Sequence, residues 1–336
     1  MLRGHQTWVF DKGPVITAAA AVGGPFEAKG PLAEDFDLLH GDLWVGKDSF
    51  EKAERKMLEE ACETAVRKAG LQKQDIQFFL SGDLANQITA SSFAARTLAV
   101  PYFGLYGACS TSMEGLTLGS LLVDKEAARY VLCATSSHNP ATEKQYRYPT
   151  EYGAQRPPTA QWTVTGAGAA ILAGAGEGPR VTGATIGRVV DMGVTDPYNM
   201  GAAMAPAAVD TITAHFRDLG LSGRDYDLIA TGDLGRVGHR IAAGLLAEHG
   251  LAIPPEIFTD CGILIYGPEQ KTVMAGGSGC ACSAAVTYGH IMNRMKKGEL
   301  NKVLIVATGA LLSPLSYQQK ESIPCIAHAV ALENRQ

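Results

Sequence analysis

The chain has 336 residues, of which 46% are hydrophobic and 19% are charged, and it contains 38 glycines. This length and composition predict one large or two medium globular domains with tightly packed α/β layers, and they exclude a coiled coil and a disordered chain. The formal net charge of -5 argues against nucleic acid as a partner, and no apolar run reaches the roughly 18 residues that a membrane-spanning helix needs.

Strand-like apolar runs alternate with helix-like segments from the N-terminus onward. Buried strands are expected at Val15–Val22 and Ile76–Leu80, and helices at Phe50–Gly70 and Ser91–Leu98. The first helix should end at Gly70. Its apolar face is formed by Met57, Ala61, Ala65 and Val66. This alternation predicts the α/β class.

The sequence contains an internal repeat. Gly107–Thr135 and Cys280–Thr308 align without a gap, both contain Ala-Cys-Ser near the start, and both end in Ala-Thr. Each copy has the pattern of a turn, a helix and a buried strand, and upstream of it Phe79–Leu84 resembles Ile229–Leu234. Two matches in the same order predict a duplicated α/β unit. We therefore divide the chain near the Gly-rich segment Gly174–Pro179 into two halves, 1–175 and 176–336.

The seven cysteines are scattered and form no Cys-x-x-Cys pair. Such spacing indicates reduced thiols and predicts neither disulfides nor a metal site. The N-terminal residues carry a charge, but no apolar segment follows them, so a secretory signal is not expected. We therefore expect the protein to be made and kept in the cytoplasm.

The run Tyr102–Gly115 passes from strand-like residues through a small-residue turn into a helical pattern, with Cys109 where the helix begins. A thiol at a helix N-terminus lies near free N–H groups and the positive end of the helix dipole, which stabilise the thiolate and lower its pKa. The same N–H groups can hold a carboxylate or an oxyanion. Spacing alone leaves two interpretations open, a functional thiol or a small buried residue.

A strand, a Gly-Ala-Cys-Ser turn and a helix, placed in the first of two similar halves, resemble the nucleophile turn of the thiolase superfamily. The resemblance implies a thiolase-like fold, in which two similar α/β halves are layered as αβαβα and the active-site cysteine falls on Cys109. Claisen condensation also requires imidazole or amide groups, which the second half supplies in that superfamily. The two matching positions hold no imidazole here, since one lies near Gly232 and the other at Gly277 or Ser278.

Two missing polarising groups predict a protein without condensing activity, because the loss of one oxyanion donor costs about 100- to 1,000-fold. The sequence therefore assigns no catalytic residue. One alternative stays open, a thiolase or ketoacyl synthase-type acyltransferase that uses Cys109 and polarises its thioester with His328 or His138. The run Pro324–His328 favours it, because this run resembles the segment of thiolases that carries a second, acid/base cysteine.

Longer stretches resemble a narrower branch of the superfamily, the stage V sporulation protein AD family of spore-forming bacteria. They include Ser81–Leu84, Gly104–Met113, Ala134–Asn139, Tyr146–Gly153 and Trp162–Ala170. The resemblance implies a non-catalytic protein that binds dipicolinic acid and works with membrane proteins of the same sporulation operon to load calcium dipicolinate into the spore. It also implies peripheral association with the forespore inner membrane, and no cofactor apart from calcium as a companion of dipicolinate. A homodimer is expected by analogy, since thiolases pair through their first-half sheets.

Dipicolinate is a planar pyridine dicarboxylate, so its site needs N–H donors or cations for the carboxylates and an apolar or aromatic slot for the ring. Strand ends in an open α/β sheet line a common crevice. We therefore predict a pocket at the Cys109 turn that includes the ends of the preceding and following strands. Its candidate residues are Cys109, Asp83, Asn86, Thr135, Ser136, Ser137, His138 and Arg147.

The loop around Arg147 is expected to supply the positive charge, with Arg156 as the alternative source. The ring face would come from Tyr146, Tyr148 or Tyr152. A bound calcium ion would let Asp83 and Asp233 face the ligand without repulsion. The open alternative is that this Pro-rich loop is a solvated surface or a dimer contact.

Overall fold

The structure is a computed structural model, and it describes residues 1–146 and 156–334. The strands of the first half that form its sheet are β3 (Val15–Gly23), β5 (Phe78–Gly82), β6 (Tyr102–Gly104), β7 (Tyr130–Ser137) and β9 (Gly166–Ala173). Those of the second half are β10 (Arg180–Ile186), β11 (Leu228–Thr231), β12 (Phe258–Asp260), β14 (Lys302–Ala310) and β15 (Cys325–Glu333).

The two halves arrange these strands in the same way. The spatial order is β6-β5-β7-β9-β3 in the first half and β12-β11-β14-β15-β10 in the second. In each half the last strand along the chain, β9 or β15, is antiparallel to both of its neighbours, while the other pairs are parallel. The sheets touch through one pair of residues, Arg180 and Val15. An internal duplication produces this repetition of strand order and strand direction.

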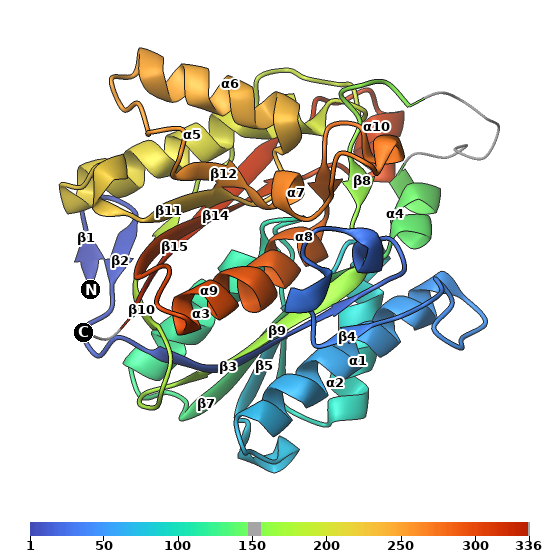
Figure 1. Ribbon diagram of the computed structural model, residues 1–336, viewed down its shortest axis with the longest axis vertical. Helices are drawn as coiled ribbons and strands as arrows, with labels where there is room; N and C mark the ends of the chain where they lie inside the picture. Colours follow the sequence, from blue (N-terminus) through green and yellow to red (C-terminus); the bar gives the residue numbers. More distant parts are fainter. Residues whose placement is uncertain (147–155, 335–336) are drawn as a thin grey trace.

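The helices lie in three layers that alternate with the sheets (Figure 1). α1 (Phe50–Lys68) and α2 (Thr89–Leu98) cover the outer face of the first sheet, and α5 (Met200–Leu219) and α6 (Gly235–Glu248) lie outside the second. Between the sheets lie α3 (Thr111–Asp124), α8 (Cys280–Ala285) and α9 (Met292–Lys296). This confirms the predicted αβαβα layering. Within residues 1–146 and 156–334, no helix is both long and apolar enough to cross a membrane.

Short elements complete the chain. The short strands are β1 (Leu2–Arg3), β2 (Thr7–Val9), β4 (Leu38–Leu39), β8 (Trp162–Thr163) and β13 (Gly277–Ser278). The short α-helices are α4 (Asn139–Tyr146), α7 (Cys261–Leu264) and α10 (Pro314–Gln318). Single turns of 3-10 helix lie at Glu27–Lys29, Ala33–Asp35, Lys73–Asp75, Asn86–Ile88, Gly223–Asp225 and Lys271–Val273.

Helix α1 shows how local sequence specifies these elements. The Ser49 hydroxyl accepts the N–H of Lys52 at 3.2 Å and caps the first turn. The helix ends at Lys68, and Gly70 then adopts a φ of +68°, a conformation that a glycine takes without a steric penalty. Its predicted apolar face packs on the first sheet, with Met57, Ala61, Ala65 and Val66 all buried.

The second copy of the repeat differs from the first where its helix begins. Residues 107–110 form a turn before α3, whereas the aligned residues 280–283 are already helical in α8. The prediction of a turn at the start of the second copy is therefore wrong. The turn lies earlier, where Gly276 and Gly279 have φ values of 136° and 99° that favour glycine. A π-helical segment, Val286–Ile291, then connects α8 to α9.

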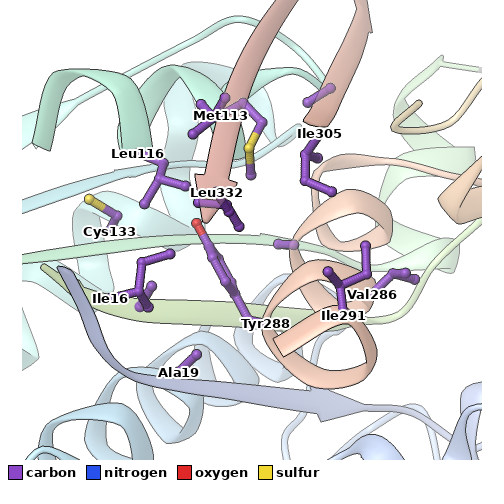
Figure 2. Close-up of a cluster of buried hydrophobic side chains, with 14 of the residues drawn as sticks. Ile16, Ala19, Met113, Leu116, Cys133, Val286, Tyr288, Ile291, Ile305 and Leu332 are labelled. Atoms are coloured by element: carbon purple, nitrogen blue, oxygen red, sulfur yellow. The ribbon is translucent and has the colours of Figure 1, made fainter. Parts of the chain in front are cut away.

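Tyr288 of the π-helical segment lies in the middle of the core. Figure 2 shows its ring among apolar side chains from both sheets and from α3, with the hydroxyl directed toward Leu332. The residue is buried, and its hydroxyl has no hydrogen-bond partner among the described residues. A second buried tyrosine, Tyr266, instead donates its hydroxyl to Glu27 Oε1 and so links the second half to the first.

We predict that Tyr288→Phe raises the free energy of unfolding by about 1 to 2 kcal/mol, because it removes a hydroxyl that is buried without a partner. Tyr266→Phe removes the same atom from a bonded hydroxyl and should lower the free energy of unfolding by a similar amount. Chemical denaturation of both variants measures the difference. A loss of stability in Tyr288→Phe would contradict the absence of a partner for its hydroxyl.

Candidate functional site

Cys109 lies in a tight turn between β6 and α3. Ala108 has a φ of +50°, which is uncommon for a residue with a Cβ atom. Thr111 Oγ1 accepts the N–H of Gly107 at 2.9 Å and donates to Ala108 O at 2.7 Å, and Ser110 Oγ donates to Gly107 O at 2.6 Å. The closed turn packs the Cys109 side chain against the second half, where it is 6% exposed.

The carboxyl group of Asp233, in the turn after β11, meets the Cys109 thiol. Asp233 Oδ1 accepts the hydroxyl of Thr308 at 2.7 Å. Its Oδ2 accepts the N–H of Gly279 at 2.9 Å and the hydroxyl of Ser278 at 3.2 Å. Asp233 thus ties the ends of β11 and β14 to the start of α8, directly beside the cysteine.

The pKa of Cys109 is raised well above its usual value, first by burial and then by the charge of Asp233. The N–H of Gly279 acts in the opposite direction and has a smaller effect. The prediction that a helix N-terminus lowers this pKa is therefore wrong, because α3 begins two residues later, at Thr111, and a carboxyl group contacts the thiol. Near neutral pH Cys109 is a protonated thiol.

Packing leaves no room for an imidazole at the first of the two expected positions. A Cβ atom on Gly232 would lie 2.9 Å from the Cα atom of Ala307, so even a methyl group would collide with the backbone of β14. At the second position, a Cβ atom on Gly277 would lie 2.8 Å from the side chain of Ile265, and the Ser278 hydroxyl is bonded to Asp233. These two positions therefore supply no imidazole, and a carboxyl group lies next to them.

A small cavity of about 30 Å³ opens beside Cys109. The rings of Tyr106 and Tyr146 form one side, with their hydroxyl oxygens 3.2 Å apart. This volume holds about one water molecule. The other lining residues combine hydroxyl groups with apolar side chains, and they are Leu84, Thr142, Thr163, Met200, Ser278, Ala310 and Leu312.

The predicted residues of β7 point in alternate directions, as the pleat of a strand requires. The hydroxyls of Thr135 and Ser137 bond with backbone atoms of α8 at 3.1 and 3.2 Å. Ser136 points to the other face and donates to Glu54 Oε1 at 3.0 Å. All three hydroxyls are buried. The structure thus brings Thr135 and Ser137 to the layer that contains Cys109 and places Ser136 on the opposite side of the sheet.

Asp83, Asn86 and His138 are not among the described residues that line the cavity. The buried Asp83 carboxylate accepts a backbone N–H of α2 at 2.7 Å, and Asn86 is exposed. His138 donates to a backbone carbonyl at 2.8 Å, and its ring stacks on Phe50. Burial lowers the pKa of His138 to about 4, so the ring is neutral.

Three residues of the predicted loop, Arg147, Tyr148 and Tyr152, lie outside the described residues. Arg156, the alternative cation, pairs with Glu143 at 3.2 Å and lies over the ring of Trp162 at 4.8 Å. Tyr146 does line the cavity. The ligand-binding roles of the eight candidate residues stay predictions, and of the seven that the structure describes, Cys109 lines the cavity.

Three residues line the cavity although the sequence did not indicate them, namely Tyr106, Thr142 and Thr163. Tyr106 lies three residues before Cys109 in the same turn, so its place in the turn was the available signal. Thr163 reaches the site because β8 pairs in parallel with β13 of the second half. No local pattern indicates that pairing, nor the contact between Asp233 and Cys109.

Comparisons with known proteins show the family to which the chain is similar. The chain matches the family described as Stage V sporulation protein AD over residues 4–333. It is 50% identical over 332 residues to Stage V sporulation protein AD of Bacillus subtilis, covering 99% of this chain and 98% of that protein.

Solved structures of two enzymes have a similar fold. One is 3-oxoacyl-(acyl-carrier-protein) synthase III of Aquifex aeolicus, with a TM-score of 0.61 and 16% identity, covering 96% of this chain and 100% of that chain. The other is human mitochondrial 3-ketoacyl-CoA thiolase in complex with CoA, with a TM-score of 0.62 and 14% identity, covering 99% of this chain and 100% of that chain. These similarities confirm the thiolase-like fold.

We predict that Asp233→Asn makes Cys109 more reactive, because loss of the carboxylate charge lowers the thiol pKa. Alkylation by iodoacetamide at pH 8, followed by mass spectrometry of the Cys109 peptide, should be about tenfold faster or more. Asp260→Asn is the matched control, since Asp260 is also buried but accepts its hydrogen bonds from Thr231 and the β11–α6 turn. An unchanged rate in Asp233→Asn would contradict the electrostatic explanation.

Proposed function

This chain belongs to the stage V sporulation protein AD family, and from that membership we propose that it binds dipicolinate as the calcium chelate and does not catalyse acyl condensation. In this proposal it is the dipicolinate-binding component of a sporulation transport system. It acts at the forespore inner membrane as a peripheral protein, together with membrane proteins of the same operon.

The contact between Asp233 and Cys109 carries the non-catalytic part of the proposal. Condensation needs a thiolate and a donor that stabilises negative charge on the thioester oxygen. Here a carboxyl group lies beside the thiol and raises its pKa, and it would repel a developing oxyanion. The two histidines considered for the acyltransferase alternative, His138 and His328, are not among the described residues that line the cavity.

The negative charge of Asp233 favours binding of the calcium chelate over binding of free dipicolinate. Free dipicolinate carries two negative charges near neutral pH and would be repelled by the Asp233 carboxylate, whereas its calcium complex is neutral. Calcium takes about six to eight oxygen ligands. Dipicolinate supplies carboxylate oxygens, and the hydroxyls of Thr142 and Thr163 lie at the cavity wall. The calcium ion thus supplies the positive charge that the site needs next to the carboxylates of the ligand and of Asp233.

Binding of a pyridine ring requires the cavity to widen at Tyr106. This side chain is 44% exposed, and its hydroxyl contacts that of Tyr146 at 3.2 Å. Outward rotation of Tyr106 breaks one neutral hydrogen bond, at a cost of about 1 kcal/mol. The exposed ring faces of the two tyrosines then offer stacking surfaces for the pyridine.

A homodimer would form at the free edge of the first sheet. β6 pairs with β5 on one side, and Phe103 of β6 is 48% exposed. Pairing of two β6 strands would satisfy their backbone groups and cover both phenylalanine rings. Sedimentation velocity should show a dimer for the wild-type chain and a monomer for Phe103→Glu. A wild-type monomer at micromolar concentration would refute this arrangement.

Calorimetric titration of the purified chain with dipicolinate, with and without calcium, tests the binding proposal. We expect saturable binding that is roughly tenfold tighter or more with calcium, because the chelate carries no net charge. Cys109→Ala should weaken binding by about tenfold. Cys62→Ala, which shortens a buried cysteine of α1, is the matched control and should leave binding unchanged.

Acetyl-coenzyme A is the control ligand in the same experiment. The proposal expects no acylation of Cys109 and no turnover. If Cys109 is acylated and dipicolinate does not bind, the protein is a condensing enzyme and the proposal fails.

A further inference from the structure

A second cavity, of about 890 Å³, lies beside α3. Its walls come from the N-terminal strands β1 and β2, from α3, and from the end of β10, to which β2 is paired. Trp8, Leu118 and Ile186 make part of this wall apolar. The volume lies within the range of about 300 to 1,000 Å³ that small organic ligands occupy. We call it the α3 cavity, and it shares no described lining residue with the cavity at Cys109.

Glu114 of α3 brings a carboxyl oxygen to this cavity. Thr117 lies about one turn further along the helix and also lines the cavity. Thr117 Oγ1 and Glu114 Oε2 are themselves fully buried, and Oε2 is directed at the Gly107 turn, where a Cβ atom on Gly107 would lie 2.8 Å from it. Glu114 Oε1 is therefore the carboxyl oxygen that a ligand in the cavity can reach. Burial raises the pKa of Glu114.

His328 of β15 adds a donor to the α3 cavity. It is 7% exposed, and its Nδ1 accepts the N–H of Gly187 at 3.3 Å. Burial lowers the pKa of His328 to about 4, so the ring is neutral and its proton lies on Nε2. The cavity therefore combines an N–H donor with a carboxyl group.

The two arginines at the cavity already have acidic partners. Arg188 donates to both carboxylate oxygens of Asp210, the shortest contact being 2.7 Å, and Arg217 pairs with Asp218 at 2.8 Å. An anionic ligand would compete with these acids and would meet Glu114. A cationic ammonium group has donors only, so it would leave the Nε2–H group of His328 without an acceptor. The charges at the cavity therefore favour a neutral ligand.

We propose that the α3 cavity binds a neutral amphipathic molecule whose apolar body packs on Trp8, Leu118 and Ile186. Its terminal hydroxyl or carboxamide donates to Glu114 and accepts from His328 Nε2. This site is separate from the proposed dipicolinate site and does not depend on it.

Three probes with the same alkyl chain and different head groups test the proposal: octan-1-ol, octanoate and octylammonium. Calorimetric titration of the full chain should show saturable binding of octan-1-ol and about tenfold weaker binding of the two charged probes. Glu114→Leu and His328→Phe should each weaken octan-1-ol binding by about tenfold. The matched control is His239→Phe, which replaces a half-buried histidine outside the cavity and should leave binding unchanged.

Thermal unfolding of each variant, recorded in parallel, shows which variants fold. If one of the two variants does not fold, the other still tests the proposal. Octan-1-ol binding that persists in Cys109→Ala supports a separate site. The proposal is overturned by the absence of saturable octan-1-ol binding, by equal affinity for the three probes, or by wild-type affinity in the folded Glu114 and His328 variants.

Discussion

The buried carboxyl group of Asp233 is the constraint that organises the centre of the molecule. A carboxylate inside a protein is costly unless donors surround it. Here the donors are Thr308 on β14 and Ser278 and Gly279 at the start of α8, so three segments of the second half must converge on one point. The first half delivers Cys109 to that same point. The chemistry of the thiol follows from this convergence rather than from the turn that carries it.

The two halves share their strand order, and the site arises where they differ. In the first half the turn before the central helix contains Cys109, whereas in the second half the helix begins earlier and a glycine-rich turn precedes it. Gly279 in that turn has a φ of 99°, and a Cβ atom there would lie 2.7 Å from Ser137 Oγ. Only glycine lets this backbone approach β7 and donate its N–H to Asp233.

Helix α3 connects the two cavities. The turn that precedes it presents Cys109 to the small cavity, and its first turns present Glu114 to the larger one. Glu114 also contacts the Cys109 turn, since a Cβ atom on Gly107 would lie 2.8 Å from its Oε2. In the two proposals above, the central helix of this fold therefore serves two ligands of different chemistry, a calcium chelate and a mostly apolar molecule.

The sequence by itself determined the α/β class, the duplication and the lack of imidazole at Gly232, because these are properties of local periodicity and of residue identity. The buried face of α1 followed from the helical period alone. The tertiary structure decided which side chains meet. Asp233 is 124 positions from Cys109, yet its carboxyl group adds to burial in raising the pKa of the thiol. Ser136 turned away from the site because successive residues of a strand point to opposite faces. Partners of buried polar groups come from segments far apart in the chain, so only the packing of the two halves selects them.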